Sequence, residues 1–173
     1  MLTLQTERLD LVACPEQVAR AAFGGTRQLE TLVGAKIARE WLDDEGRGLL
    51  NYYWHMISAD PTNLGYGLWM IIHRTDKVMF GTAGFKGKPN SAGIIEIGYG
   101  IDKAYRRQGY TFEAAHALVN WGFAQPNVTA VTADCLTTNL GSIRVLEKLG
   151  MARTGLVGSY LQWRLEKPER GAV

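Results

Sequence analysis

The sequence predicts an α/β domain with a mixed, mostly antiparallel sheet of six or seven strands and helices on both faces of the sheet. The first observation is that strand-like patterns recur along the chain, at residues 2–12, 66–73, 77–88, 94–101, 128–135, 151–157 and 160–166. The second is that helical patterns separate them, at residues 15–50, 109–124 and 139–149. This alternation is typical of layered α/β folds. With 173 residues, 46% of them hydrophobic, the chain suits one domain, at residues 1–166, followed by a polar tail at 167–173.

The N-terminal part is expected to be a strand, then helices, then a hairpin. Residues 2–12 alternate imperfectly between polar and apolar side chains, and residues 15–50 have a helical pattern that glycines interrupt. Residues 66–73 and 77–88 form a hairpin across a turn at 74–76. Four acidic residues lie near the end of the helical region, Glu40, Asp43, Asp44 and Glu45. They could attract a protonated amine, although charge on a helix is more often a solvated face.

The strand at residues 94–101 carries an unusual set of side chains. Because side chains alternate between faces, one face is apolar, with Ile95, Ile97, Tyr99 and Ile101. The other face carries Ile94, Glu96, Gly98 and Gly100. A glycine inside a strand permits the close approach of a backbone or a ligand. The alternative is that the glycines make room for a packed helix and that Glu96 reaches solvent.

A short basic turn opens the next helix, with the sequence Arg106-Arg107-Gln108-Gly109-Tyr110-Thr111. The first N–H groups of a helix have no partner inside it and the helix dipole is positive there, so this turn predicts a site for a phosphate-bearing ligand. Glycine lets the backbone approach the phosphate, and the two arginines add charge with bidentate geometry. Common nucleotide fingerprints are absent: Gly87-Lys88 runs into Pro89, and Lys103 lies where a dinucleotide motif would have its third glycine.

The C-terminal part contains two helices and three strands. The helix at 109–124 ends before Pro126, and a strand at 128–135 follows it. Thr137-Thr138-Asn139 opens the helix that ends at Gly150. Asn139 or Thr138 could simply cap this helix.

Three motifs together resemble one enzyme family. Residues 105–111, followed by Glu113-Ala114, resemble the acetyl-CoA pyrophosphate loop of the GNAT superfamily of N-acetyltransferases. Residues 139–151 resemble the Asn-x-x-Ser…Glu-Lys-Leu-Gly-Phe block of its ribosomal-protein N-terminal acetyltransferase (RimJ/RimL-like) branch, and Thr6-Glu7-Arg8-Leu9 is similar to the opening strand of that branch. The motifs occur in the order of the family and span most of the chain.

The resemblance implies a sheet splayed at its centre, with the pantetheine arm of acetyl-CoA in the gap. The cofactor-binding residues it implies are Tyr99, Ile101, Arg106, Arg107, Gln108, Gly109, Tyr110, Thr111, Asn139 and Ser142. Glu96 faces the expected cleft and is the candidate base, and a backbone N–H near Tyr99 to Ile101 is the candidate oxyanion donor.

Protonation of the leaving thiolate remains open between two alternatives. Leu146 stands where many family members carry a proton-donating tyrosine. Either Ser142 donates, which makes it the second candidate catalytic residue, or the thiolate leaves without assistance, which a thiol pKa near ~8.5 tolerates.

We therefore expect an acetyl-CoA-dependent N-acetyltransferase that acts on a primary amine, either a protein N-terminus or a small molecule. The alternatives are a non-catalytic CoA-binding regulatory module and a nucleotide-binding protein. A net charge of +2 gives no support for nucleic acid as a partner, and the scattered histidines and two cysteines predict no metal site. No segment has the length of a membrane span or the pattern of a signal peptide, so we expect a cytoplasmic protein. The closing strands offer an edge through which a homodimer could form.

Overall fold

A nine-stranded sheet organises the chain in the computed structural model, which describes residues 1–38 and 44–169, with the backbone alone at 44–47. The strands are β1 (Thr3–Gln5), β2 (Leu9–Ala13), β3 (Lys36–Ile37), β4 (Leu68–His73), β5 (Val78–Phe85), β6 (Ile94–Ile101), β7 (Ala130–Leu136), β8 (Ala152–Val157) and β9 (Tyr160–Glu166). The helices are α1 (Glu16–Ala21), α2 (Thr26–Val33), α3 (Asp44–Ala59), α4 (Tyr110–Ala124) and α5 (Leu140–Lys148), with short 3₁₀ turns η1 (Pro61–Asn63) and η2 (Lys103–Tyr105).

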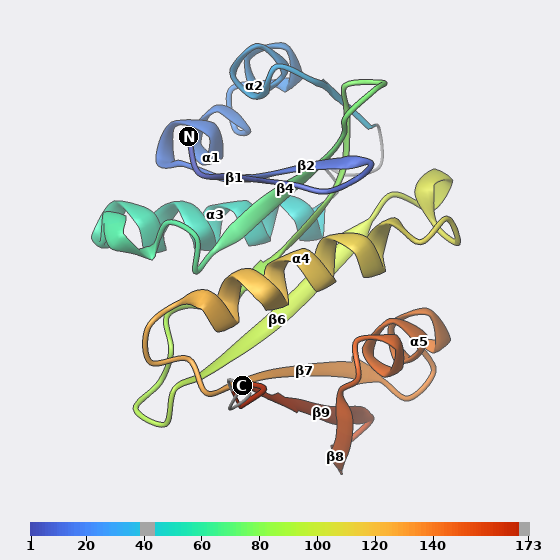
Figure 1. The fold of residues 1–173 in the computed structure, drawn as a ribbon. Helices are drawn as coiled ribbons and strands as arrows, with labels where there is room; N and C mark the ends of the chain where they lie inside the picture. Colours follow the sequence, from blue (N-terminus) through green and yellow to red (C-terminus); the bar gives the residue numbers. More distant parts are fainter. Residues whose placement is uncertain (39–43, 170–173) are drawn as a thin grey trace.

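The sheet is mixed and mostly antiparallel, as predicted. Its strand order is β1-β2-β4-β5-β6-β7-β9-β8, and β3 pairs with β5 outside this path. Two pairs are parallel, β3 with β5 and β6 with β7, and the other pairs are antiparallel. Figure 1 shows the N-terminal strands at one end of the molecule and the β8–β9 hairpin at the other.

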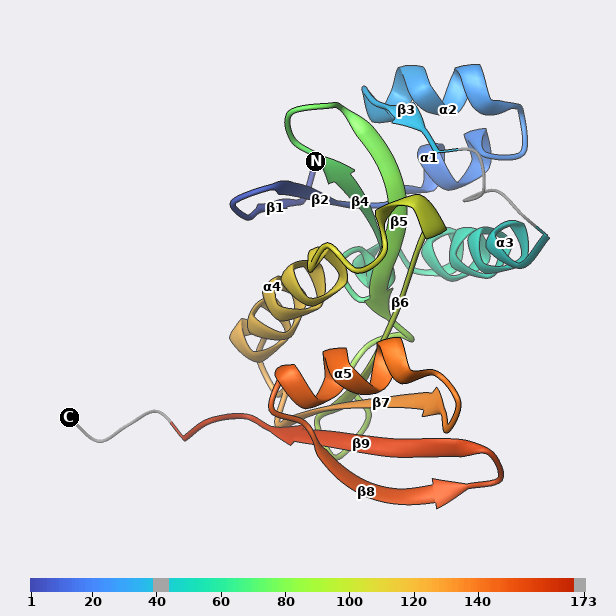
Figure 2. The same ribbon diagram turned by 90° about the vertical axis from the view of Figure 1, so that its right-hand side faces the viewer.

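Helices cover both faces of the sheet, which confirms the predicted layers. Figure 2 shows α4 and α3 on opposite sides of the central strands. One apolar cluster joins α4 and α5 to the sheet and contains the buried residues Phe80, Phe85, Ile95 and Ile97. A second cluster lies under α1 and α3 and contains Val18, Tyr53, Met70 and Met79.

The strand count differs from the prediction of six or seven for two reasons. The first predicted strand folds into a hairpin, because a turn after β1 brings the N–H of Thr6 to the carbonyl of Leu9 over 2.9 Å. The short strand β3 adds to the edge of β5, which the helical interpretation of residues 15–50 missed. In addition, α3 continues to Ala59, beyond the predicted end at residue 50.

Two glycines that face each other across β5 and β6 have different surroundings. Gly84 and Gly98 are register partners. A Cβ atom on Gly84 would lie 2.1 Å from the carbonyl oxygen of Gly67, whereas a Cβ atom on Gly98 would meet no described atom within 4 Å. Gly84 therefore permits the close approach of backbone at the start of β4, and Gly98 leaves open space above β6.

These surroundings predict opposite results for the same substitution. Gly84→Ala should lower the free energy of unfolding by about 1–3 kcal/mol, because the strands must shift to admit the methyl group. Gly98→Ala should leave it unchanged or raise it slightly, since alanine restricts the unfolded chain. Urea unfolding of the two variants beside the wild type checks this, and equal stability of the two would contradict the close approach at Gly84.

Candidate active site

The parallel strands β6 and β7 pair over only part of their length. Ile94, Ile95 and Glu96 pair with residues 130–132, whereas β6 continues to Ile101. Figure 2 shows the two strands diverging beyond this point, with α5 beside β7. We call the last paired position, Glu96 opposite Thr132, the fork, and the region beyond it, where β6 and β7 are no longer paired, the gap. A splayed sheet was expected from the family resemblance, and the register places the splay here.

The backbone of β6 points alternate peptide groups into the gap. The N–H of Lys86 donates to the carbonyl of Glu96 over 2.9 Å, and the N–H of Asp102 donates to a β5 carbonyl over 2.8 Å. In these bonds the backbone N–H and C=O groups of even-numbered β6 residues point towards β5. Because antiparallel pairing alternates along a strand, the N–H and C=O groups of Tyr99 and Ile101 point away from β5, towards the gap. The Ile101 carbonyl accepts a bond from Arg106 Nε at 3.2 Å. Backbone N–H and C=O groups are strong hydrogen-bonding groups, so a strand edge that presents them favours a ligand lying along β6.

The predicted faces of β6 are confirmed. Ile95 and Ile97 are buried against the α4 side, and Tyr99 packs partly against the same cluster. On the other face, a Cβ atom on Gly98 or Gly100 would meet no described atom within 4 Å. The alternative in which these glycines make room for a packed helix is therefore wrong for the described part of the chain.

Glu96 lies at the fork in an ion pair that sequence reasoning missed. Its carboxylate accepts a hydrogen bond from the ammonium of Lys86, the residue that follows β5. Asp134 of β7 is the second carboxylate near this ammonium, at 3.9 Å. The Glu96 side chain is 36% exposed, so it is open to solvent or a ligand on the α3 side of the sheet.

The surroundings of this ion pair shift the pKa values of two groups, Tyr53 and Lys86. Burial, with contributions from Tyr52 and Glu96, raises the pKa of Tyr53 above its ordinary value, and the Tyr53 hydroxyl donates to the Phe85 carbonyl over 2.8 Å. Partial burial alone would lower the pKa of Lys86, but the hydrogen bond and charge of Glu96, with contributions from Asp134 and Tyr160, raise it. Lys86 is therefore held as an ammonium at neutral pH.

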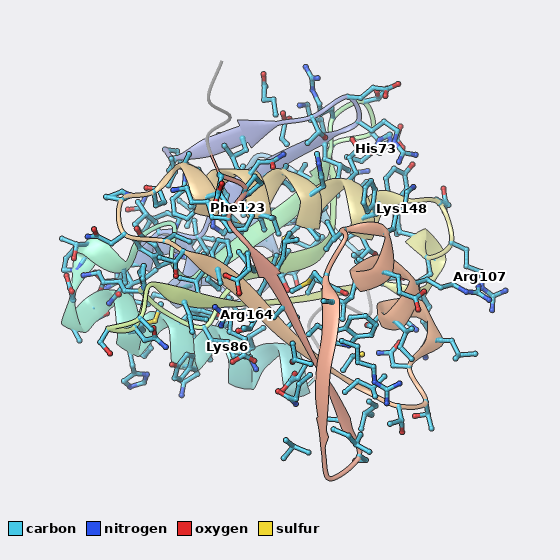
Figure 3. The ribbon with its side chains drawn as sticks, turned by 60° about the horizontal axis from the view of Figure 1, so that its bottom comes forward. His73, Lys86, Arg107, Phe123, Lys148 and Arg164 are labelled. Atoms are coloured by element: carbon cyan, nitrogen blue, oxygen red, sulfur yellow. The ribbon has the colours of Figure 1, made fainter. Side chains whose placement is uncertain are left out.

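The basic turn has the geometry of an anion site. Arg107 and Gly109 both have left-handed backbone, with φ of 62° and 84°. Gly109 is the N-cap residue of α4, and no described side chain caps the helix there. Residues 106–109 are exposed, and Figure 3 shows Arg107 projecting outward. Free first-turn N–H groups beside exposed arginines favour a phosphate ligand.

One of the predicted cofactor residues has a different role for its side chain. Tyr110 is 9% exposed, and its ring packs against Phe80. Its hydroxyl lies 3.3 Å from Nε2 of His73. Only the backbone of Tyr110 therefore faces the ligand end of the helix, while the exposed side chain of Gln108 bonds the carbonyl of Ala104 over 3.1 Å. Thr111, in the first turn, is half-buried.

A carboxylate clamp fixes the start of α4 to the N-terminal hairpin. Glu113 Oε1 accepts bonds from the Thr6 hydroxyl at 2.6 Å and the Arg8 N–H at 2.9 Å. Glu113 Oε2 accepts from Arg8 Nε and lies 2.7 Å from a second guanidinium nitrogen. Arg8 also donates to the Gln108 carbonyl at 3.0 Å and lies over the Tyr110 ring. The Thr6-Glu7-Arg8-Leu9 motif therefore holds the basic turn in place.

The beginning of α5 borders the gap on the β7 side. Asn139 is the N-cap residue, and its Oδ1 accepts a bond from the Ser142 N–H at 3.1 Å, as the capping interpretation predicted. The Tyr99 hydroxyl reaches across to the Ser142 carbonyl at 3.4 Å. Burial raises the pKa of Tyr99 above its ordinary value, so this hydroxyl stays protonated at neutral pH. Leu146 is 1% exposed and belongs to the core.

Two further expectations from the sequence concern the acidic residues at 40–45 and a metal site. Glu40 and Asp43 lie outside the described residues, and only the backbone of Asp44 and Glu45 is described. Within the described ranges, no cluster of three or more His, Cys, Asp or Glu side chains could hold a metal ion. No described helix is both long and apolar enough to cross a membrane.

The chain is similar to acetyltransferases over most of its length. Residues 8–152 match the family model described as acetyltransferase (GNAT) domain. The uncharacterized N-acetyltransferase YjdG of Bacillus subtilis (strain 168) is 32% identical over 163 residues, which cover 94% of this chain and 97% of that protein. The ribosomal-protein-S5-alanine acetyltransferase of Vibrio fischeri has a similar structure, with a TM-score of 0.67, 15% identity, and coverage of 96% of this chain and 97% of that chain. RimL, a ribosomal L7/L12 alpha-N-protein acetyltransferase solved in complex with coenzyme A, has a TM-score of 0.66 at 15% identity over 95% of this chain and 98% of that chain.

The clamp predicts a pH-dependent contribution to stability. Partial burial alone would raise the pKa of Glu113, but the hydrogen bonds from Thr6 and Arg8 and the charge of Arg8 hold it below its ordinary value. A lowered pKa means that the stabilisation is fully present above the unfolded value of about 4.3 and is lost as the pH falls through the folded value. Glu113→Gln should therefore cost about 1–2 kcal/mol at pH 7, and the difference from wild type should narrow in acid.

Denaturant unfolding across a pH series measures this difference. Glu147→Gln, at an exposed position of α5, is the matched control and should stay within about 0.5 kcal/mol of wild type at pH 7. A cost for Glu113→Gln that is equal at neutral and acid pH would show that the charge of the clamp does not carry its stability.

Proposed function

Because the chain belongs to the GNAT acetyltransferase family and is an acetyl-CoA-dependent acetyltransferase, we propose that it acetylates a primary amine with Glu96 as the base. The observation that carries this proposal is the position of Glu96 at the fork, where the gap opens and the side chain remains accessible. The acceptor is a protein N-terminus or a small-molecule amine.

The described residues fit acetyl-CoA because they offer hydrogen-bond donors at the start of α4 and open space over Gly98 and Gly100. Arg106, Arg107 and the first N–H groups of α4 would hold the phosphates, since the turn offers uncapped donors and exposed positive charge. Gln108, Gly109, Tyr110 and Thr111 would contribute backbone of the same turn. When bound, acetyl-CoA supplies an activated acetyl group, so the chain needs no nucleophile of its own.

The gap supplies the remaining contacts with the cofactor. The peptide groups of Tyr99 and Ile101 would bond the pantetheine arm and the thioester oxygen. Asn139 uses its Oδ1 for the helix cap, which leaves its Nδ2 amide to donate. Ser142 follows in the first turn of α5.

The chain's part in the chemistry is mainly proton transfer. An acceptor amine arrives as an ammonium and must lose a proton before it can attack, and a Glu96 carboxylate oxygen would take that proton directly or through one water. On the leaving side, the Ser142 hydroxyl would give a proton to the thiolate sulfur, or the thiolate leaves unassisted. The half-buried Tyr99 hydroxyl donates to the Ser142 carbonyl, which holds the first turn of α5 beside β6.

The choice of acceptor depends on which branch of the family the chain follows. The motifs at 6–9 and 139–151 resemble the RimJ/RimL-like branch and favour a protein N-terminus. A pooled assay of CoA release decides it, with N-terminal peptides in one pool and small amines, including polyamines, in the other. Release with the peptides supports the branch, release with the small amines alone removes it, and no release with either pool overturns acetylation of a primary amine.

The role of Glu96 has its own test. Glu96→Gln should lower kcat by about 10²–10⁴-fold, the range for loss of a general base, and leave the affinity for acetyl-CoA unchanged. Glu166→Gln is the matched control, because Glu166 is bound to Arg164 and lies on β9 opposite Ala130 of β7, one strand further from β6 than the fork. Wild-type turnover of Glu96→Gln with the acceptor from the pooled assay would remove Glu96 as the base.

Because Arg107 has left-handed backbone, a glycine substitution there should change ligand binding without lowering stability. A non-glycine residue in this conformation costs about 1–2 kcal/mol, which glycine relieves. Arg107→Gly should therefore keep nearly wild-type stability, while its dissociation constant for acetyl-CoA rises about tenfold through loss of a charge-assisted bond. Arg106→Gly is the control, since Arg106 has an ordinary φ of −70° and should lose both stability and affinity.

Thermal unfolding with and without acetyl-CoA measures both quantities in one series. If Arg107→Gly loses as much stability as Arg106→Gly, strain at position 107 is absent. If its affinity is unchanged, the Arg107 side chain does not contact the cofactor.

A further inference from the structure

Lys86 lies at the meeting point of three strands. It follows β5, and its backbone is paired with Glu96 of β6. Its ammonium donates to the Glu96 carboxylate and lies 3.9 Å from Asp134 of β7. Figure 3 shows Lys86 on the sheet beside α3. One cation thus connects carboxylates from both sides of the fork.

The charge at this position does not balance. Among the described side chains, the titratable groups that act on Lys86 are Glu96, Asp134 and Tyr160 of β9, and Tyr53 of α3 faces Glu96 from the other side. Two carboxylates, Glu96 and Asp134, therefore share the one ammonium of Lys86. A second cation, such as the ammonium of an acceptor, would find a net negative charge here.

The ion pair of Lys86 and Glu96 is also placed to control the direction in which the Glu96 carboxylate points. A glutamate side chain that is 36% exposed has several rotamers available in solvent, and a base must be held in one of them to reach its proton. A hydrogen bond from Lys86 to one carboxylate oxygen restricts these rotamers and leaves the other oxygen for the acceptor.

We propose that Lys86 is a positioning residue for acetyl transfer, which holds the Glu96 carboxylate at the fork and shares its charge with Asp134. This inference rests on the proposed role of Glu96 as the base. Lys86 contacts neither acetyl group nor acceptor; it acts through Glu96.

The test is a double-mutant cycle between Lys86 and Glu96. Lys86→Gln should lower kcat about tenfold, a typical coupling for residues in contact, with an unchanged KM for acetyl-CoA. Lys86→Arg should recover most of kcat, because a guanidinium also donates to a carboxylate. In a Glu96→Gln background, Lys86→Gln should cause no further loss. A merely structural lysine would lower the rate in both backgrounds.

Lys88→Gln is the matched control. Lys88 lies two residues further on, is 39% exposed, and pairs with Asp60 at 2.6 Å, away from the fork. The assay uses the pool member with the fastest CoA release, and thermal unfolding establishes that each variant is folded.

The outcomes separate the two proposals. Suppose that Glu96→Gln is slow. If the folded Lys86→Gln variant then turns over like wild type, or if the double variant is slower than Glu96→Gln alone, the role of Lys86 is overturned and Glu96 stays as the base. If Glu96→Gln alone turns over like wild type, the proposed base fails, and the role of Lys86 fails with it.

Discussion

The carboxylate of Glu113 connects two segments that are far apart in the sequence, the N-terminal hairpin and the basic turn of the candidate anion site. It lies one turn inside α4, and it accepts hydrogen bonds from Thr6 and from both the backbone and the guanidinium of Arg8. An acidic side chain in the first turn of a helix stabilises the helix dipole, but alone it would also repel a phosphate arriving at the same end. Arg8 neutralises that charge and donates to the Gln108 carbonyl, so the turn is held while its N–H groups remain free for an anion.

The gap depends on a different constraint, the early end of pairing between β6 and β7. Gly98 and Gly100 place no side chains above β6, and Tyr99 fills the other face by reaching to the first turn of α5. Because α5 follows β7 and begins at its own cap, Asn139, the two strands stay apart while each is anchored to a helix. The open space over Gly98 and Gly100 is therefore present in the fold without a ligand.

The sequence predicted the elements on which local patterns act, and it failed where contacts come from distant segments. The strand at 94–101 and the cap at Asn139 follow from side-chain alternation and capping chemistry, and both are confirmed. Lys86 and Asp134 carry no local signal, because only the pairing of β5, β6 and β7 brings them to Glu96. Tyr110 was assigned to the ligand by its place in a motif, whereas its ring belongs to the core, as an aromatic residue at the buried edge of a helix usually does.

The charges along β6 also determine which way a ligand must lie. Arg106 and Arg107 follow the end of β6 at Ile101, whereas Glu96 lies at the fork, five residues before that end. Asp134 of β7 lies near it, 3.9 Å from the Lys86 ammonium. Five residues of strand span about 17 Å, which separates the positive end from the negative end by more than a Debye length at physiological salt, ~8 Å. A cofactor with phosphates at one end and a neutral thioester at the other would therefore bind with its phosphates at α4. Its reactive end would then lie at the fork, where the negative charge attracts an ammonium and repels a phosphate.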